Sequence, residues 1–171
     1  IYSYHTDALI SDVIEDLAEE KNISETFAQN YLYLAGLTIH STQDSDMQKE
    51  VEEEFLKRQY RLKSSDGEST AQAAMVIMDH KTGKVLACVG GLGEKEYFRG
   101  LNRATQSQRQ TGSAIKPLAV LVPGIDRKIF TASTIYDDSK KTFENDYSPG
   151  NNDGGYLGEI TVRRALESSQ N

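Results

Sequence analysis

The chain has 171 residues, of which 37% are hydrophobic and 26% are charged, a balance typical of a globular domain. Its net charge of −7 argues against a nucleic-acid-binding protein, because such proteins carry a basic excess or a basic stripe. One local basic patch remains, formed by Arg99, Arg103, Arg109 and Lys116. No stretch is apolar enough to span a bilayer and no signal peptide opens the chain, so we expect any membrane anchor to lie outside it.

The first third of the chain is predicted to be helical. Apolar residues recur at helical spacing over residues 6–21, with acidic residues between them, and Asn22 is a plausible helix end. Ser24 is a good N-cap for a second helix over residues 25–35, which Gly36 would end.

The next segments predict a short strand and a third helix. Residues 37–42 alternate apolar and polar, as a half-buried strand does. Asp44 can cap a helix whose core stripe would be Met47, Val51 and Phe55. The polar residues 63–70 are the best internal boundary. We therefore divide the chain into a helical linker region, residues 1–70, and the start of a second domain, residues 71–171.

A β-hairpin is predicted after this boundary. Two apolar runs, residues 73–78 and 84–89, are joined by a turn in which Gly83 supplies the unusual backbone angle. Apolar residues on both strand faces predict a sheet that is covered on both sides. Cys88, the single cysteine, lies in the second run, so we expect a buried thiol and no disulfide.

The remaining chain is predicted to be loops and two helices. Residues 90–112 show little periodicity, and a helix should begin near Ser113 and end before Pro123. Residues 142–158 are again loop-like, and a closing helix is expected over residues 161–167, with an apolar face of Val162, Ala165 and Leu166.

The strongest chemical signal is the pair Ser113 and Lys116. A serine hydroxyl is a poor nucleophile until a neighbour takes its proton, and residues three apart on a helix share one face. Gly112 permits a tight turn before the serine, whose helix N-terminus would offer N–H groups to an oxyanion. Pro117 conflicts mildly with this helix unless the helix begins close to Ser113. By itself the pair is weak evidence, since it could be an exposed serine beside a solvated lysine.

The surrounding motifs strengthen the signal. Ser-x-x-Lys together with a downstream Ser-x-Asn belongs to the motif set of penicillin-binding proteins, and Ser169-Gln170-Asn171 follows in the right order. The resemblance extends over most of residues 36–171. The segments that resemble class A, bifunctional penicillin-binding proteins are residues 36–44, 79–87, 102–104, 109–113, 147–151 and 161–166.

This resemblance implies an α+β fold, the incomplete transpeptidase domain of the penicillin-binding and serine β-lactamase type, preceded by the helical linker. Carried over by position, Ser113 is the nucleophile and Lys116 its general base. Ser169 would relay protons to the leaving group, and Asn171 would hold the substrate backbone and Lys116. The implied activity is D,D-transpeptidation of stem peptides that end in D-Ala-D-Ala, with acylation of the same serine by β-lactams.

One departure from the family concerns Lys-Thr-Gly, which should follow Ser-x-Asn. Here Lys81-Thr82-Gly83 precedes Ser113, so we interpret it as a turn sequence. Because the later Lys-Thr-Gly strand is not among these residues, we expect the fragment alone to be inactive or badly impaired.

The resemblance also implies the setting of the domain and leaves two alternatives. It places the domain outside the cytoplasmic membrane of a bacterium, behind a membrane anchor and a glycosyltransferase domain. It implies no metal or organic cofactor, and His5, His40 and His80 lack metal-ligand spacing. The alternatives are a penicillin-recognising sensor that acylates without turnover, and a structural fragment in which residues 1–70 dock a partner domain.

Overall fold

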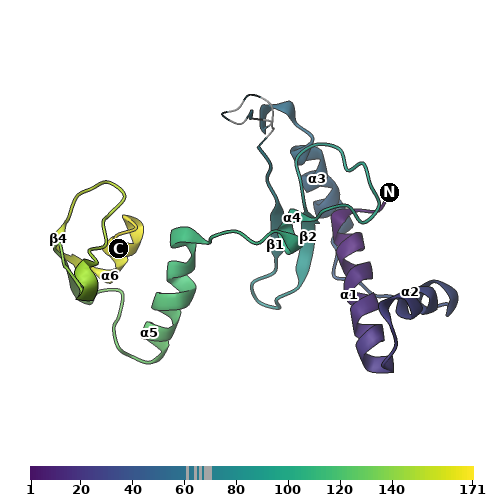
Figure 1. Cartoon of the computed structure of the whole chain (residues 1–171), viewed down its shortest axis with the longest axis horizontal. Coiled ribbons are helices and arrows are strands. Elements are labelled where there is room, and N and C mark those ends of the chain that lie inside the picture. Colours follow the sequence, from purple (N-terminus) through teal and green to yellow (C-terminus); the bar gives the residue numbers. More distant parts are fainter. Residues whose placement is uncertain (61, 64, 66, 68–70) are drawn as a thin grey trace. The chain divides into compact units, whose positions relative to one another are not determined.

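A computed structural model gives the fold of the chain and describes residues 1–60, 62, 63, 65, 67 and 71–171. The chain forms two compact units, residues 1–108 and 109–171 (Figure 1). The predicted boundary loop, residues 63–70, lies mostly outside the described residues, so the division after residue 70 stays a prediction. Within the described residues, no helix is both long enough and apolar enough to cross a membrane.

The first unit is built on two packed helices, α1 (Tyr4–Lys21) and α2 (Glu25–Leu34). Figure 1 shows α2 beside the C-terminal half of α1. Asn22 ends α1 in a left-handed conformation, and the Ser24 hydroxyl accepts the N–H of Phe27, as a helix N-cap does. The predicted end of the first helix at Asn22 and the predicted start of the second helix after Ser24 are confirmed. The core between the helices consists of Ile10, Ile14, Ala28 and Leu32.

Helix α3 (Ser45–Phe55) is followed by a short 3-10 turn, η1 (Arg58–Tyr60). Asp44 caps α3 by accepting two backbone N–H groups, as predicted. The predicted apolar stripe is only partly correct, because the buried residues are Gln48 and Phe55, whereas Met47 and Val51 are half-buried. Gln48 exchanges two hydrogen bonds with the backbone of Cys88, at 2.8 and 2.9 Å, which satisfy its buried amide.

The predicted hairpin is present as β1 (Met75–Met78) and β2 (Val85–Val89), paired antiparallel, with Gly83 at φ +74° in the turn. The prediction that both sheet faces are covered is wrong for β1, since Met75, Val76 and Met78 are 42–56% exposed. Helices α1 and α3 pack against β2. Short helix α4 (Arg103–Gln106) interrupts the predicted loop after the hairpin.

The strand predicted over residues 37–42 does not form. The segment is held to β2 at its end, where Thr42 Oγ donates to Val85 O and the Asp44 N–H donates to Leu86 O. Alternation of apolar and polar residues suits a strand, but a strand also needs a continuous hydrogen-bonded partner, which these two contacts do not supply.

The second unit begins with a continuous helical segment. It runs through 3-10 turn η2 (Gly112–Ile115), π-helix η3 (Pro117–Leu121) and helix α5 (Val122–Asp126). The predicted end before Pro123 is therefore wrong. Pro123 is tolerated because it lies in the first turn of α5, where the missing N–H costs little, and the preceding π-turn closes on Val122 with a bond to Pro117 O.

The rest of this unit is a small sheet and a closing helix. Strands β3 (Ile135–Asp138) and β4 (Gly158–Thr161) pair antiparallel, with 3-10 turn η4 (Glu144–Asp146) in the loop between them. Sequence reasoning missed both strands, because each is only four residues long, and β3 is largely exposed. Helix α6 (Val162–Glu167) closes the unit as predicted, with Thr161 as its N-cap.

The ring of Phe130 packs directly on the backbone of Gly124 and closes the core of the second unit. A Cβ atom at residue 124 would overlap that ring. Gly124→Ala should therefore lower the free energy of unfolding by about 1–3 kcal/mol, the usual cost of overpacking. Urea unfolding of the chain measures the change, and Gly150→Ala, which meets open space, is the matched control. Equal stability of the two variants would contradict this packing.

Candidate active site

Ser113 and Lys116 lie on one turn at the start of the helical segment. The Lys116 N–H donates to Ser113 O, which is the three-residue spacing of a 3-10 turn. Pro117 has no N–H and cannot form the α-helical bond to Ser113 O, so the tighter turn is favoured. Side chains three apart lie directly above one another in such a turn. Gly112 precedes it at φ +53°, the left-handed backbone expected of a glycine there.

The amine of Lys116 contacts the end of the chain. Its Nζ donates to Gln170 O at 2.7 Å, Asn171 Oδ1 at 2.8 Å and Ser169 O at 2.9 Å, with Ser169 Oγ at 3.4 Å. An ammonium group has three donors, so the three short contacts use all of them. All four acceptors are uncharged oxygens. Hydrogen bonds of one amine thus gather three residues more than fifty positions later in the chain.

Residues 169–171 are aimed by the end of helix α6. The Ser169 N–H bonds to Leu166 O and the Gln170 N–H bonds to Ala165 O, the pair of bonds that defines a Schellman motif. Ser169 occupies the left-handed position of this motif, at φ +55°, where glycine is usual. The turn reverses the chain and presents the carbonyls of Ser169 and Gln170 to Lys116.

Three of the four predicted site residues are therefore in direct contact: Lys116, Ser169 and Asn171. Ser113 is exposed, and in the described part of the chain its hydroxyl makes no hydrogen bond to Lys116 or to another residue. The three Nζ donors of Lys116 are used on residues 169–171. A hydrogen bond between Ser113 and Lys116 would therefore need the Ser113 hydroxyl to donate and Lys116 Nζ to accept. Loss of one proton from Nζ would leave a lone pair for the Ser113 hydroxyl.

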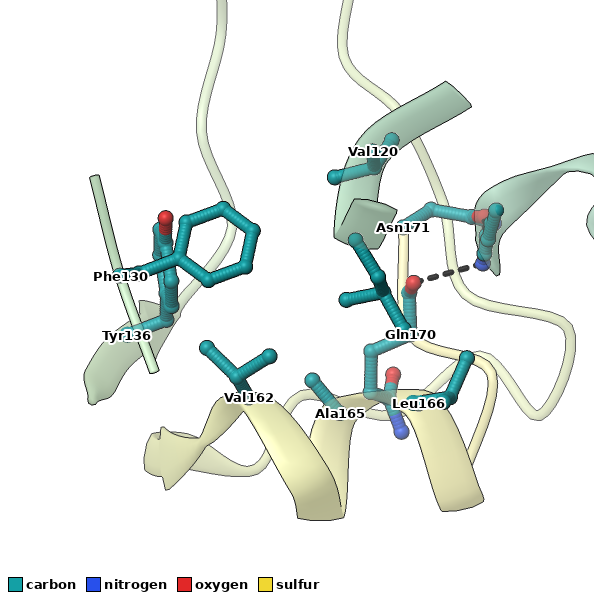
Figure 2. Close-up of a pocket in the computed structure, with 10 residues that line it drawn as sticks. Val120, Phe130, Tyr136, Val162, Ala165, Leu166, Gln170 and Asn171 are labelled. Atoms are coloured by element: carbon teal, nitrogen blue, oxygen red, sulfur yellow. Dashed lines mark hydrogen bonds between the residues drawn. The ribbon is translucent and has the colours of Figure 1, made fainter. Parts of the chain in front are cut away.

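A cavity of about 290 Å³ adjoins Lys116 within the second unit. Figure 2 shows its wall, with Phe130 and Tyr136 facing Gln170 and Asn171 and with α6 below. Apolar side chains dominate the lining. They are Val120, Leu121, Phe130, Val162, Ala165 and Leu166. Lys116 and Asn171 are thus among the residues that line a mainly apolar cavity.

Other candidate groups lie outside this site. Residues 81–83 form part of the hairpin turn, where Thr82 Oγ donates to Asp79, and the hydrogen bonds from Thr82 and Lys81 lower the pKa of the Asp79 carboxyl. Burial raises the pKa of the Cys88 thiol, so that it stays protonated, as expected of an inert buried cysteine. In the described ranges, no three acidic, histidine or cysteine side chains gather as metal ligands would.

Sequence reasoning missed two contributors to the site. The Gln170 carbonyl makes the shortest contact to Lys116, but every residue has a carbonyl and no residue type signals its use. Asn151 accepts the N–H of Asn171 at 2.7 Å. Its segment, residues 147–151, carried part of the family resemblance, which was the available signal.

Comparison with known proteins places this chain in a family. The family model of the penicillin-binding protein transpeptidase domain matches residues 73–171. The chain is 34% identical to penicillin-binding protein 1A of Clostridium tetani, covering 99% of this chain and 23% of the relative. It is 32% identical to penicillin-binding protein 1F of Bacillus subtilis, covering 96% of this chain and 22% of that relative.

Solved structures agree with this result. The penicillin-binding protein PonA1 of Mycobacterium tuberculosis superposes with a TM-score of 0.70 at 25% identity, over 97% of this chain and 39% of that one. Its complex with penicillin V superposes with a TM-score of 0.71 at 26% identity, over 98% and 40%. The chain belongs to the penicillin-binding protein transpeptidase family, which confirms the resemblance and the α+β fold expected from the sequence. It spans less than a quarter of the length of these curated relatives.

The left-handed backbone of Ser169 gives a stability prediction. A side chain in this conformation costs about 1 kcal/mol or more relative to glycine. Ser169→Gly should therefore be more stable than Ser169→Ala by about 1 kcal/mol, although both lack the hydroxyl. The control pair is Ser168→Gly and Ser168→Ala, because Ser168 is right-handed at φ −89° and the order should reverse. Urea unfolding of the four variants decides, and the same order at both positions would contradict the left-handed turn.

Proposed function

We propose that this chain carries the nucleophile of a D,D-transpeptidase of peptidoglycan synthesis, with Ser113 as the residue acylated by stem peptides that end in D-Ala-D-Ala. The observation that best supports the proposal is the set of contacts from Lys116 Nζ to Ser169, Gln170 and Asn171. These contacts gather two motifs that the sequence separates, at the turn that carries an exposed serine.

The proposed reaction has two steps. Ser113 Oγ attacks the carbonyl carbon between the two D-alanines and passes its proton to the neutral amine of Lys116. The C–N bond breaks as Ser169 gives its proton to the leaving nitrogen and takes in its place the proton held by Lys116, and D-alanine departs. An amine of a second stem peptide then attacks the ester and gives up one proton to the neutral amine of Lys116, the C–O bond to Ser113 breaks, and Lys116 returns that proton to the serine oxygen. Asn171 Oδ1 holds Lys116, and Asn171, which is among the residues that line the cavity, would contact the substrate backbone.

A β-lactam would acylate the same serine, since its strained amide offers the same carbonyl. The PonA1 protein of Mycobacterium tuberculosis has been solved in complex with penicillin V, which supports this part of the proposal. We further propose an extracytoplasmic location, a membrane anchor and a glycosyltransferase domain elsewhere in the natural protein, in line with the class A relatives. The helical residues 1–70 would then be the linker that precedes the transpeptidase domain.

Labelling with a fluorescent penicillin tests the nucleophile. In the natural protein that carries this chain, we expect covalent labelling that is lost in Ser113→Ala, because no other hydroxyl shares the turn with Lys116. Ser133→Ala, an exposed serine elsewhere in the second unit, is the matched control and should label like the parent. Labelling of Ser113→Ala at the parental level would contradict the assignment.

A second assay separates the enzyme from a sensor. A sensor module would be acylated by penicillin but would not join two peptides. Incubation of the natural protein with a D-Ala-D-Ala stem peptide and an acceptor amine should give released D-alanine and a cross-linked product. Acylation without either product would favour the sensor.

A further inference from the structure

Asn151 is a buried polar side chain whose hydrogen bonds lead toward Lys116. It is 9% exposed and lies in the loop between β3 and β4. Its amide nitrogen donates to Gly155 O at 2.8 Å and to the carboxylate of Asp138 at 3.2 Å. Its carbonyl oxygen accepts the backbone N–H of Asn171 at 2.7 Å. Donor and acceptor sides of the buried amide are both satisfied, so its orientation is fixed.

The same loop also holds the side chain of Asn171. Asn171 Nδ2 donates to Gly150 O at 2.8 Å, which turns Asn171 Oδ1 toward Lys116 Nζ, also at 2.8 Å. Asp138 in turn accepts the Leu157 N–H at 2.8 Å and is held at the end of strand β3. A hydrogen-bonded series therefore runs from Asp138 through Asn151 and Asn171 to Lys116.

We propose that Asn151 is a positioning residue, which fixes residues 169–171 so that their oxygens orient the Lys116 amine for proton transfer. Asn151 does not contact Lys116, so its effect passes through Asn171. This inference rests on the proposed function, since it assigns Asn151 to the acylation of Ser113. Its consequence is kinetic: the rate of the chemical step falls when Asn151 is lost, whereas reversible binding of the penicillin changes little.

The order of donors and acceptors from Asp138 through Asn151 to Asn171 allows a rescue experiment. Asn151→Asp keeps the acceptor for the Asn171 N–H but removes the donor and places a second carboxylate against Asp138. Adding Asp138→Asn restores one donor and one acceptor between the two positions, with their order exchanged. The new asparagine can still accept the Leu157 N–H. Only the bond to Gly155 O is then lost, so the recovery should be partial.

The experiment measures acylation of the natural protein by a fluorescent penicillin, with the reversible binding constant and the first-order acylation rate obtained separately. Asn151→Ala and Asn151→Asp should each lower the acylation rate by roughly tenfold or more, with a change in binding below about threefold. The double variant Asp138→Asn with Asn151→Asp should recover most of the loss seen in Asn151→Asp. Asn152→Ala, the exposed neighbour, should match the parent.

Each outcome supports or overturns the proposal. Rescue of the rate by the double variant supports it and shows that the loss is not simple unfolding. Parental rates in Asn151→Ala would overturn it, and so would an equal loss in the double variant and in Asn151→Asp when both remain folded by circular dichroism. If the parent itself is not acylated at Ser113, the proposed function has failed, which is a different result from a parent that reacts and variants that do not differ.

Discussion

The hydrogen bonds of a single lysine amine hold the candidate site together. Lys116 Nζ uses its three donors on oxygens of residues 169–171. Those oxygens converge because helix α6 ends in a Schellman turn at a left-handed serine and because Asn151 holds the N–H of Asn171. The amine is available at this place because Pro117 favours a 3-10 turn beneath Ser113. Each of these local features would be of little consequence without the lysine that connects them.

The uncharged character of the acceptors matters for chemistry. An ion pair would orient Lys116 but would also supply a fixed negative charge, whereas carbonyl, amide and hydroxyl oxygens orient the amine without one. The cavity beside Lys116 is lined mainly by apolar side chains. Uncharged oxygens of residues 169–171 thus hold the amine in place.

Much of the fold could be predicted from local signals. The caps Ser24 and Asp44, the glycine turn at Gly83 and the helix after Thr161 all act within a few residues, and each is present. The failures needed information from distant residues. Residues 37–42 have a strand pattern but no continuous partner, and β3 and β4 are recognisable only as a pair. Pro123 is accommodated by a π-turn that no local rule predicts.

The candidate site also has residues that the sequence could predict and residues that it could not. Ser113, Lys116, Ser169 and Asn171 could be proposed from motif spacing, and the structure brings the last three into contact. The Gln170 carbonyl could not be proposed, because backbone groups leave no mark in the sequence. Asn151 could be noticed only as part of a resembling segment, since its role depends on a hydrogen bond across twenty positions of chain.

The most direct test of Lys116 as the base, rather than as a structural cross-link, is the substitution Lys116→Arg in the natural protein. A guanidinium can reach neutral oxygens and keeps its charge, but it does not deprotonate in proteins. We expect Lys116→Arg to remain folded and to lose penicillin acylation of Ser113 by at least about 100-fold, the usual contribution of a general base. A folded Lys116→Arg variant that is acylated at the parental rate would show that the amine only holds residues 169–171 in place.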